Sequence, residues 1–207
     1  MTIESSAYNG LVARIVTLGS LGELWTGFQV RAAITDVPEA PHRLITLGDV
    51  TDEGIPYDQL ARMDLGDRLW RYVLNPGDIL LRPRGANYKA AVIQDLDGPV
   101  VATAPLYVFR LQVDEAIPDY LAWWINRDEV QEKLANEARG SYIPTVSKET
   151  FARLELPLPN LETQKRVAEV QGLRREERKL VGHLESLRDQ QIEAALEAAA
   201  QRQTTKQ

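Results

Sequence analysis

The stretch Leu154-Glu155-Leu156-Pro157-Leu158-Pro159-Asn160-Leu161-Glu162-Thr163-Gln164 marks a change of structure within this chain of 207 residues. Pro157 and Pro159 donate no backbone N–H, so we predict an extended segment at a sheet edge before Asn160. The next forty or so residues contain no proline and are rich in Ala, Leu, Glu, Gln, Lys and Arg, which favour helices. Asn160 is a suitable N-cap, and Glu162 suits the positive end of the helix dipole.

The predicted helix covers residues 161–203 and, at 1.5 Å per residue, would be about 64 Å long. Its apolar side chains recur at alternating spacings of three and four, with Glu177 at one core position and charged residues on both flanks. This spacing is typical of a coiled coil. The alternative is a helix that lies on its own domain. We name the apolar stripe the seam, and its residues are Val170, Leu173, Leu180, Leu184, Leu187 and Ile192.

Composition excludes several classes of protein. The chain has no cysteine, which excludes a disulfide framework, a zinc ribbon and a thiol nucleophile. No apolar run approaches the roughly 18 residues of a membrane span. The N-terminus shows neither the basic nor the apolar region of a signal peptide. We therefore expect a cytoplasmic protein with no membrane partner.

The charge is unevenly distributed along the chain. The formal net charge is −6. Residues 161–207 carry nine Lys or Arg and eight Asp or Glu, whereas residues 1–160 carry 15 and 22. An acidic body argues against nonspecific binding of nucleic acid, because phosphate contact requires cations. A local basic face remains compatible with this balance.

Short apolar segments separated by turn signals predict a β-rich domain. A helix should begin at Pro118 and stop near Gly140, with Trp123 and Trp124 in the core, and Ser147 should cap a short helix to Arg153. The fold class is therefore α+β: a β-rich domain with short helices at 1–160, a long coiled-coil helix at 161–203 and a tail at 204–207. The predicted strands are 44–47, 70–74, 79–81, 90–93, 100–102 and 106–111.

Catalytic motifs are missing. The chain has no Walker-type phosphate loop, no G-x-G-x-x-G after a strand and no G-x-S-x-G elbow. Its two histidines, His42 and His183, are far apart in the sequence, and we predict neither a catalytic nor a metal site. A binding or scaffolding role is favoured.

Two loops have side chains suited to nucleic acid. The loop 82–89 reads Arg-Pro-Arg-Gly-Ala-Asn-Tyr-Lys, and the loop 139–142 reads Arg-Gly-Ser-Tyr. Arg and Asn make paired contacts with guanine and adenine edges, while Lys and Tyr suit phosphate. The alternative is that both are ordinary exposed turns. The predicted contact residues are Arg82, Arg84, Asn87, Tyr88, Lys89, Arg139, Ser141, Tyr142 and Lys148.

Three motifs, in this order and at this spacing, resemble the specificity (S) subunit of Type I restriction–modification systems. The first is Gly77-Asp78-Ile79-Leu80-Leu81, which is similar to the family's "GDIL" segment. The second runs from Gly140-Ser141-Tyr142-Ile143-Pro144 to Phe151. The third runs from Leu156-Pro157-Leu158-Pro159 to Ala168 and is similar to the family's hinge and helix start.

The resemblance implies a non-catalytic DNA-recognition subunit of half length, since full members carry two recognition domains and two such helices. It implies double-stranded DNA and a methyltransferase subunit as partners, with S-adenosylmethionine held by that subunit and no cofactor in this chain. A restriction subunit is a further partner of the family. A homodimer would direct adenine methylation to a bipartite inverted repeat. The alternatives are a coiled-coil scaffold with a β-rich partner-binding head, which binds no nucleic acid, and an enzyme with an unrecognised site.

Overall fold

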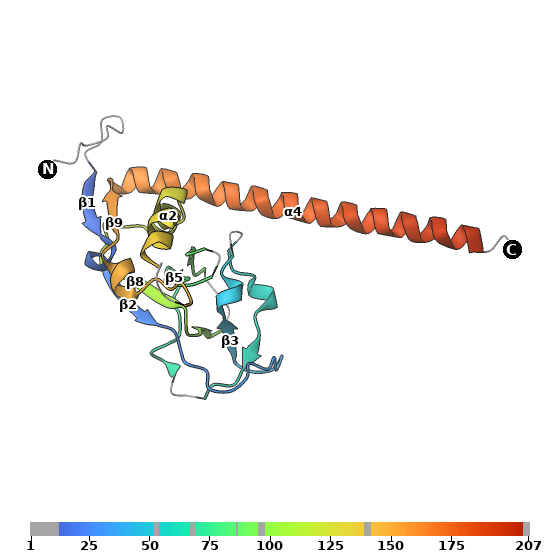
Figure 1. Cartoon of the computed structure of the whole chain (residues 1–207), viewed down its shortest axis with the longest axis horizontal. Helices are drawn as coiled ribbons and strands as arrows, with labels where there is room; N and C mark the ends of the chain where they lie inside the picture. Colours follow the sequence, from blue (N-terminus) through green and yellow to red (C-terminus); the bar gives the residue numbers. More distant parts are fainter. Residues whose placement is uncertain are drawn as a thin grey trace. The chain divides into compact units, whose positions relative to one another are not determined.

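The computed structural model describes residues 13–51, 54–66, 69–85, 87–94, 98–138 and 142–204, with side chains as far as residue 197. The chain divides into two units, Met1–Glu169 and Val170–Gln207. Among the described residues, the sheets and short helices belong to the first unit, and the second is a continuation of one long helix (Figure 1).

In the described part of the first unit, the strands form three small sheets, in which only the β3–β7 pair is parallel. The two-stranded sheet pairs β1 (Arg14–Thr17) with β9 (Glu155–Leu158). The four-stranded sheet has the order β2 (Gly22–Thr26), β8 (Tyr107–Leu111), β5 (Ile79–Leu81) and β6 (Ala90–Val92). The three-stranded sheet has the order β4 (Arg62–Met63), β3 (His42–Ile45) and β7 (Val100–Ala102).

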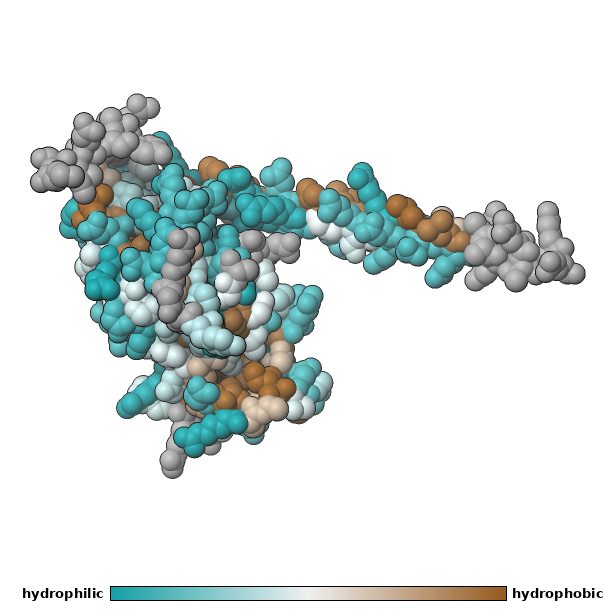
Figure 2. All heavy atoms as spheres, viewed as in Figure 1, coloured by the Kyte–Doolittle hydropathy of each residue, from teal (hydrophilic) through white to brown (hydrophobic). Residues whose placement is uncertain are grey.

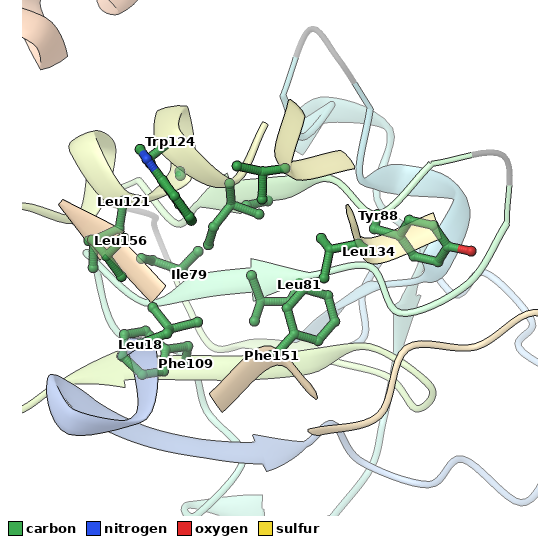
Figure 3. Close-up of a cluster of buried hydrophobic side chains, with 14 of the residues drawn as sticks. Leu18, Ile79, Leu81, Tyr88, Phe109, Leu121, Trp124, Leu134, Phe151 and Leu156 are labelled. Carbon is green, nitrogen blue, oxygen red and sulfur yellow. The ribbon is translucent and has the colours of Figure 1, made fainter. Parts of the chain in front are cut away.

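Strand β5 lies between two apolar clusters. Successive side chains of a strand point to opposite faces. Ile79 and Leu81 accordingly belong to one cluster and Leu80 to the other, and all three are fully buried. Figure 3 shows Ile79 and Leu81 among side chains from the helices, including Trp124 and Phe151. Burial on both faces explains why this strand is a continuous apolar run.

The short helices cover the first of these clusters. They are α1 (Pro118–Ile125), α2 (Asp128–Glu137) and α3 (Lys148–Ala152). Among the described residues, 3₁₀ turns also occur at Leu18–Ser20, Leu47–Asp49 and Tyr57–Gln59. Pro118 occupies the start of α1 as predicted, and the Ser147 hydroxyl accepts a hydrogen bond from the Thr150 N–H (3.1 Å) as the predicted cap of α3. Trp124 is buried and Trp123 packs at the edge of the cluster, as predicted.

Two sequence predictions were wrong. The helix predicted from Pro118 to Gly140 is broken at Asn126, because that side chain bonds both the N–H and the C=O of Ala90 at 2.8 Å. Residues 70–74 alternate like a strand but form a turn, and only Val73 makes an isolated bridge, to Val101. In both places a partner distant in sequence decides the local structure.

The extended segment before α4 pairs as expected. Leu158 lies opposite Arg14 and Glu155 opposite Thr17, so β9 is an edge strand in which Pro157 is tolerated. Helix α4 (Leu161–Thr204) then begins, and the Asn160 side chain accepts a hydrogen bond from the Thr163 N–H (2.9 Å). The predicted long C-terminal helix is confirmed. None of the helices in the described part of the chain is both long and apolar enough to cross a membrane.

Beyond residue 169, α4 carries exposed apolar side chains. Figure 2 shows apolar atoms at intervals along this helix among polar ones. Leu173 is the most exposed of the predicted seam residues at 70% and Leu187 the least at 41%. Leu196, at 57%, extends the stripe by another turn.

Candidate nucleic-acid interface

The structure brings the first predicted loop beside Thr145 and Val146, which follow the second predicted loop in the chain. The first loop joins β5 to β6 and is closed by a hydrogen bond from the Arg82 N–H to the Lys89 C=O (2.9 Å). Arg84 forms an antiparallel bridge with Thr145, and the Val146 N–H donates to the Pro83 C=O (2.8 Å). Two segments about 60 residues apart in the chain therefore form one structure.

We name this region the two-loop surface and define it by five residues: Arg82, Arg84, Lys89, Tyr142 and Lys148. Tyr142 is fully exposed, and the neighbouring Ile143 is 54% exposed. The Arg84 guanidinium has no hydrogen-bond partner among the described residues. The surface thus combines four cationic side chains with an exposed phenol, which are groups suited to phosphate and base edges.

Arg82 has a structural role within its own loop. Its Nε donates to the Arg84 C=O (3.2 Å) and one Nη donates to the Val50 C=O (3.3 Å). The guanidinium lies over Gly85, where an added Cβ would be 2.7 Å from the Arg82 Nη2. Gly85 also has a φ of 113°, a value that glycine adopts most easily. Arg82 therefore holds the loop that presents Arg84.

Two other predicted contact residues are turned inward. Tyr88 is 5% exposed and belongs to the core cluster, where Figure 3 shows its ring beside Leu134. Gln131 fixes it there by bonding the Tyr88 N–H (2.9 Å) and C=O (3.1 Å). The side-chain oxygen of Asn87 is buried without a hydrogen-bond partner among the described residues. Because the Tyr88 ring and the Asn87 oxygen are buried, both residues are left out of the two-loop surface.

The remaining predicted contact residues fall into two groups. Arg139 and Ser141 lie outside the described residues. Lys148 is the first residue of α3 and is partly exposed, and Lys89 is partly exposed at the end of the first loop.

One carboxylate lies close to these cations. Hydrogen bonds from its own backbone N–H and from the Ser147 hydroxyl, with Lys148 and Arg153 nearby, lower the pKa of the exposed Glu149. Burial, and then the charge of Glu149, raise the pKa of Tyr107, whose hydroxyl donates to the Val146 C=O (3.3 Å). Tyr107 therefore stays neutral and supports the second loop as a hydrogen-bond donor.

The aspartate of the Gly77-Asp78-Ile79-Leu80-Leu81 motif is structural. Asp78 is 1% exposed and accepts two hydrogen bonds from Arg110, at 2.7 Å and 2.6 Å, and one from the Asn75 N–H (2.7 Å). The Asp78 carboxylate raises the pKa of Arg110. A paired contact of this kind is strong and directional, and it fixes the turn from which β5 begins. The sequence identified this motif but not its partner, which is 32 residues away.

No group of three metal-ligating side chains occurs within the part of the chain that the structure describes.

Comparison with known proteins identifies the family of this chain. A family model described as "Type I restriction modification DNA specificity domain" matches residues 70–172, a range that contains both loops. The chain belongs to the Type I restriction–modification specificity family. Since the specificity subunits of this family are non-catalytic, the family confirms that the chain is not an enzyme.

Solved structures of the family share this fold. The chain is similar to the HsdS subunit from Thermoanaerobacter tengcongensis, with a TM-score of 0.58 and 17% identity over 84% of this chain and 39% of that one. For the S subunit of the Type I restriction–modification system from M. genitalium, the TM-score is 0.56 and the identity 16%, over 84% of this chain and 41% of that one. None of the curated proteins matches the chain.

A third similar chain belongs to a structure that concerns complex assembly and conformational transition of the type I R-M system. Its TM-score is 0.60 and its identity 16%, and the match covers 84% of this chain and 40% of that one. At these identities the likeness is one of fold. The chain spans about two fifths of the length of the solved structures it matches.

Proposed function

We propose that this chain is a sequence-specific DNA-recognition subunit that directs a Type I-like adenine methyltransferase to a bipartite site. One observation carries the proposal. The family model covers both loops, and backbone contacts of Pro83 and Arg84 with Val146 and Thr145 join the first loop to the segment that follows the second. DNA target recognition follows from the family, and the role of each residue is our proposal.

In this proposal the cations of the two-loop surface contact different parts of the DNA. Arg84 reads a base edge, because its guanidinium is not engaged by the described residues and guanidinium is the commonest specific reader of guanine. Lys89 and Lys148 contact phosphate, which gives affinity but no sequence information. Tyr142, which is fully exposed, packs on the sugar–phosphate backbone or on a base.

The acidic charge of residues 1–160 predicts that DNA binding by this chain depends on a partner subunit. Residues 1–160 carry seven more acidic than basic side chains, so the isolated chain should bind DNA weakly at physiological salt. We propose that a methyltransferase subunit, which holds S-adenosylmethionine, supplies much of the phosphate contact. A restriction subunit joins the complex where cleavage accompanies methylation, and the assembly acts in the cytoplasm.

We propose that a second copy of this chain covers the seam of α4. Burying one Leu or Val side chain contributes about 1.5–3 kcal/mol. Burying all six seam residues therefore offsets much of the free-energy cost of association, which is about 4–15 kcal/mol. In a parallel, in-register pair Glu177 would face Glu177 of the second copy across the seam, which brings like charges together. In an antiparallel pair Glu177 faces a different residue, so we favour the antiparallel arrangement.

Two identical reading domains at opposite ends of such a pair would recognise an inverted repeat. The recognition halves would be split by a gap whose bases are not read, and the helix would set the length of that gap. A two-fold pair is also the commonest symmetric assembly of identical chains.

The test combines a mass measurement with DNA binding. We expect a dimeric mass for the chain, alone or with its methyltransferase, and specific binding of the complex to its target duplex over a scrambled one. A monomeric mass in both states would contradict the pairing. A methyltransferase complex that binds target and scrambled duplexes equally would contradict DNA reading and favour the scaffold alternative.

A further inference from the structure

Side-chain amides hold the backbone of β6 and of the residues before it. The Asn126 amide accepts a hydrogen bond from the Ala90 N–H and donates one to the Ala90 C=O, both at 2.8 Å. The Gln131 amide does the same for Tyr88, at 2.9 Å and 3.1 Å. These amides take the place of a neighbouring strand along the edge of β6 that faces away from β5. Each of them uses both its oxygen and its nitrogen.

The amide of Asn87, next to this pinned segment, is not satisfied in the same way. Its Oδ1 is buried and has no hydrogen-bond partner among the described residues. The residue as a whole is partly exposed, as are Asn126 and Gln131, so the three amides can be compared directly. In the described part of the chain, one other buried side-chain atom lacks a partner, the Nε1 of Trp25 in β2.

An unpaired buried oxygen destabilises the folded domain. A carbonyl that loses its contact with water and gains no hydrogen bond raises the free energy of the folded state. An apolar side chain of the same shape would avoid this penalty, so folding alone does not explain an asparagine at position 87. Proteins depart from the rule that buried polar groups are paired mainly where function requires it.

The position of Asn87 indicates which function is concerned. The residue lies between Arg84 and Lys89 in the first loop, which carries cations of the two-loop surface. Trp25 lies instead in β2, where the Arg110 guanidinium is 5.2 Å from the centre of its ring. Of the two unpaired atoms, the Asn87 oxygen is therefore the one that belongs to the proposed DNA contact.

We propose that Asn87 is a base-reading residue whose amide is turned inward in the free domain and turns outward on the target DNA to pair with adenine. This inference rests on the proposed function. Asparagine pairs with adenine through two hydrogen bonds: Oδ1 accepts from the N6 amino group and Nδ2 donates to N7. The oxygen then gains the donor that it lacks in the free domain. The hydrogen bonds to Tyr88 and Ala90 hold the backbone while the side chain turns.

The first measurement is the free energy of unfolding of two matched variants, Asn87→Leu and Asn126→Leu. Leucine has the branched shape of asparagine without its polar atoms. We expect Asn87→Leu to be at least as stable as the wild type, because it removes an unpaired oxygen. Asn126→Leu should be less stable, because it leaves the Ala90 N–H and C=O unpaired. An equal loss in both variants would show that the Asn87 oxygen is paired in solution, for example by water, and would overturn the proposal.

The second measurement is binding of the methyltransferase complex to duplexes that carry its methylated site. Each adenine of the site is replaced in turn by 7-deazaadenine, which lacks the N7 acceptor and keeps the N6 amino group. We expect one position at which the wild type loses about tenfold in affinity and Asn87→Leu loses none. Trp25→Phe, which removes the other unpaired atom, is the matched control and should respond to every replacement as the wild type does.

Failure of this inference can be told apart from failure of the proposed function. If the wild-type complex binds target and scrambled duplexes equally, the proposed function is wrong and the reading role of Asn87 is wrong with it. If the wild type selects its target but every replacement affects the wild type and Asn87→Leu alike, the proposed function stands and Asn87 does not read adenine.

Discussion

The recognition domain buries most of its large apolar side chains, whereas the part of α4 beyond residue 169 exposes them to solvent. Phe151 and Leu81 are fully buried within the first unit, whereas Leu173 and Leu184 of the helix are 70% and 57% exposed. Side chains of the first kind stabilise the domain whatever the protein concentration. Those of the second kind stabilise the protein only when something binds them, so their effect should depend on concentration.

The largest expected effect breaks the domain side of this comparison. Phe151→Ala removes a fully buried ring that packs edge-on against Tyr107 (centroids 6.0 Å apart), and we expect a loss of about 3–5 kcal/mol in the free energy of unfolding. Leu184→Ala is the matched change on the helix. Urea unfolding at two protein concentrations should show a constant loss for Phe151→Ala and a concentration-dependent one for Leu184→Ala. A concentration-independent loss of the same size at Leu184 would show that the seam is covered within one chain.

A smaller effect is expected at the ion pair behind β5. Asp78→Ala leaves the Arg110 guanidinium and the Asn75 N–H without their shared partner, and we expect a loss of about 3 kcal/mol, the lower end for a broken buried pair because Arg110 is partly exposed. Thermal melts of Asp78→Ala and of Arg127→Ala, which removes an ion pair with the exposed Glu129, make the comparison. Equal melting temperatures for the two variants would refute the structural role of Asp78.

Variants of the two-loop surface should affect DNA binding more than folding, and of the residues changed here only Arg82 also supports its own loop. We expect the Arg82→Ala, Arg84→Ala double variant to lose about 1–3 kcal/mol of binding to the target duplex and to relax one base position. Lys148→Ala should weaken target and scrambled duplexes alike and reduce the salt dependence of binding by about one ion. Titrations with the methyltransferase complex at several salt concentrations measure both. Unchanged affinity and selectivity in the double variant would remove the first loop from the interface.

The smallest effect tests how α3 supports that surface. Ser147→Ala removes the cap of α3 and should cost about 1 kcal/mol of stability. Ser147→Asp, which can accept the same hydrogen bond from the Thr150 N–H, should restore most of it. Chemical unfolding separates the two variants, and equal stability of both would show that the cap contributes nothing.

Local signals in the sequence were sufficient for much of the fold. The caps Asn160 and Ser147 and the start of α1 at Pro118 depend on residues a few positions apart, and the structure bears them out. The alternation over 70–74 failed because a strand also needs a neighbour, and only Val73 has one.

The candidate site was predictable in composition but not in arrangement. Nothing in the sequence indicates that Arg84 bridges Thr145, because the two residues are far apart in the chain. Tyr88 was assigned to the surface from its polar neighbours, yet a glutamine from α2 fixes its backbone with the ring inward. The sequence gives only a weak signal for Gln131 and Gln164, because a glutamine whose amide bonds the backbone looks the same in the sequence as one that faces solvent.

The most direct measurement of the central claim is a map of methylated bases in cells with and without this chain. The account predicts that one set of methylated adenines disappears when the chain is removed. Those adenines should lie in a self-complementary site split by a gap of fixed length. Methylation that does not change, or a site that is neither split nor self-complementary, would contradict it.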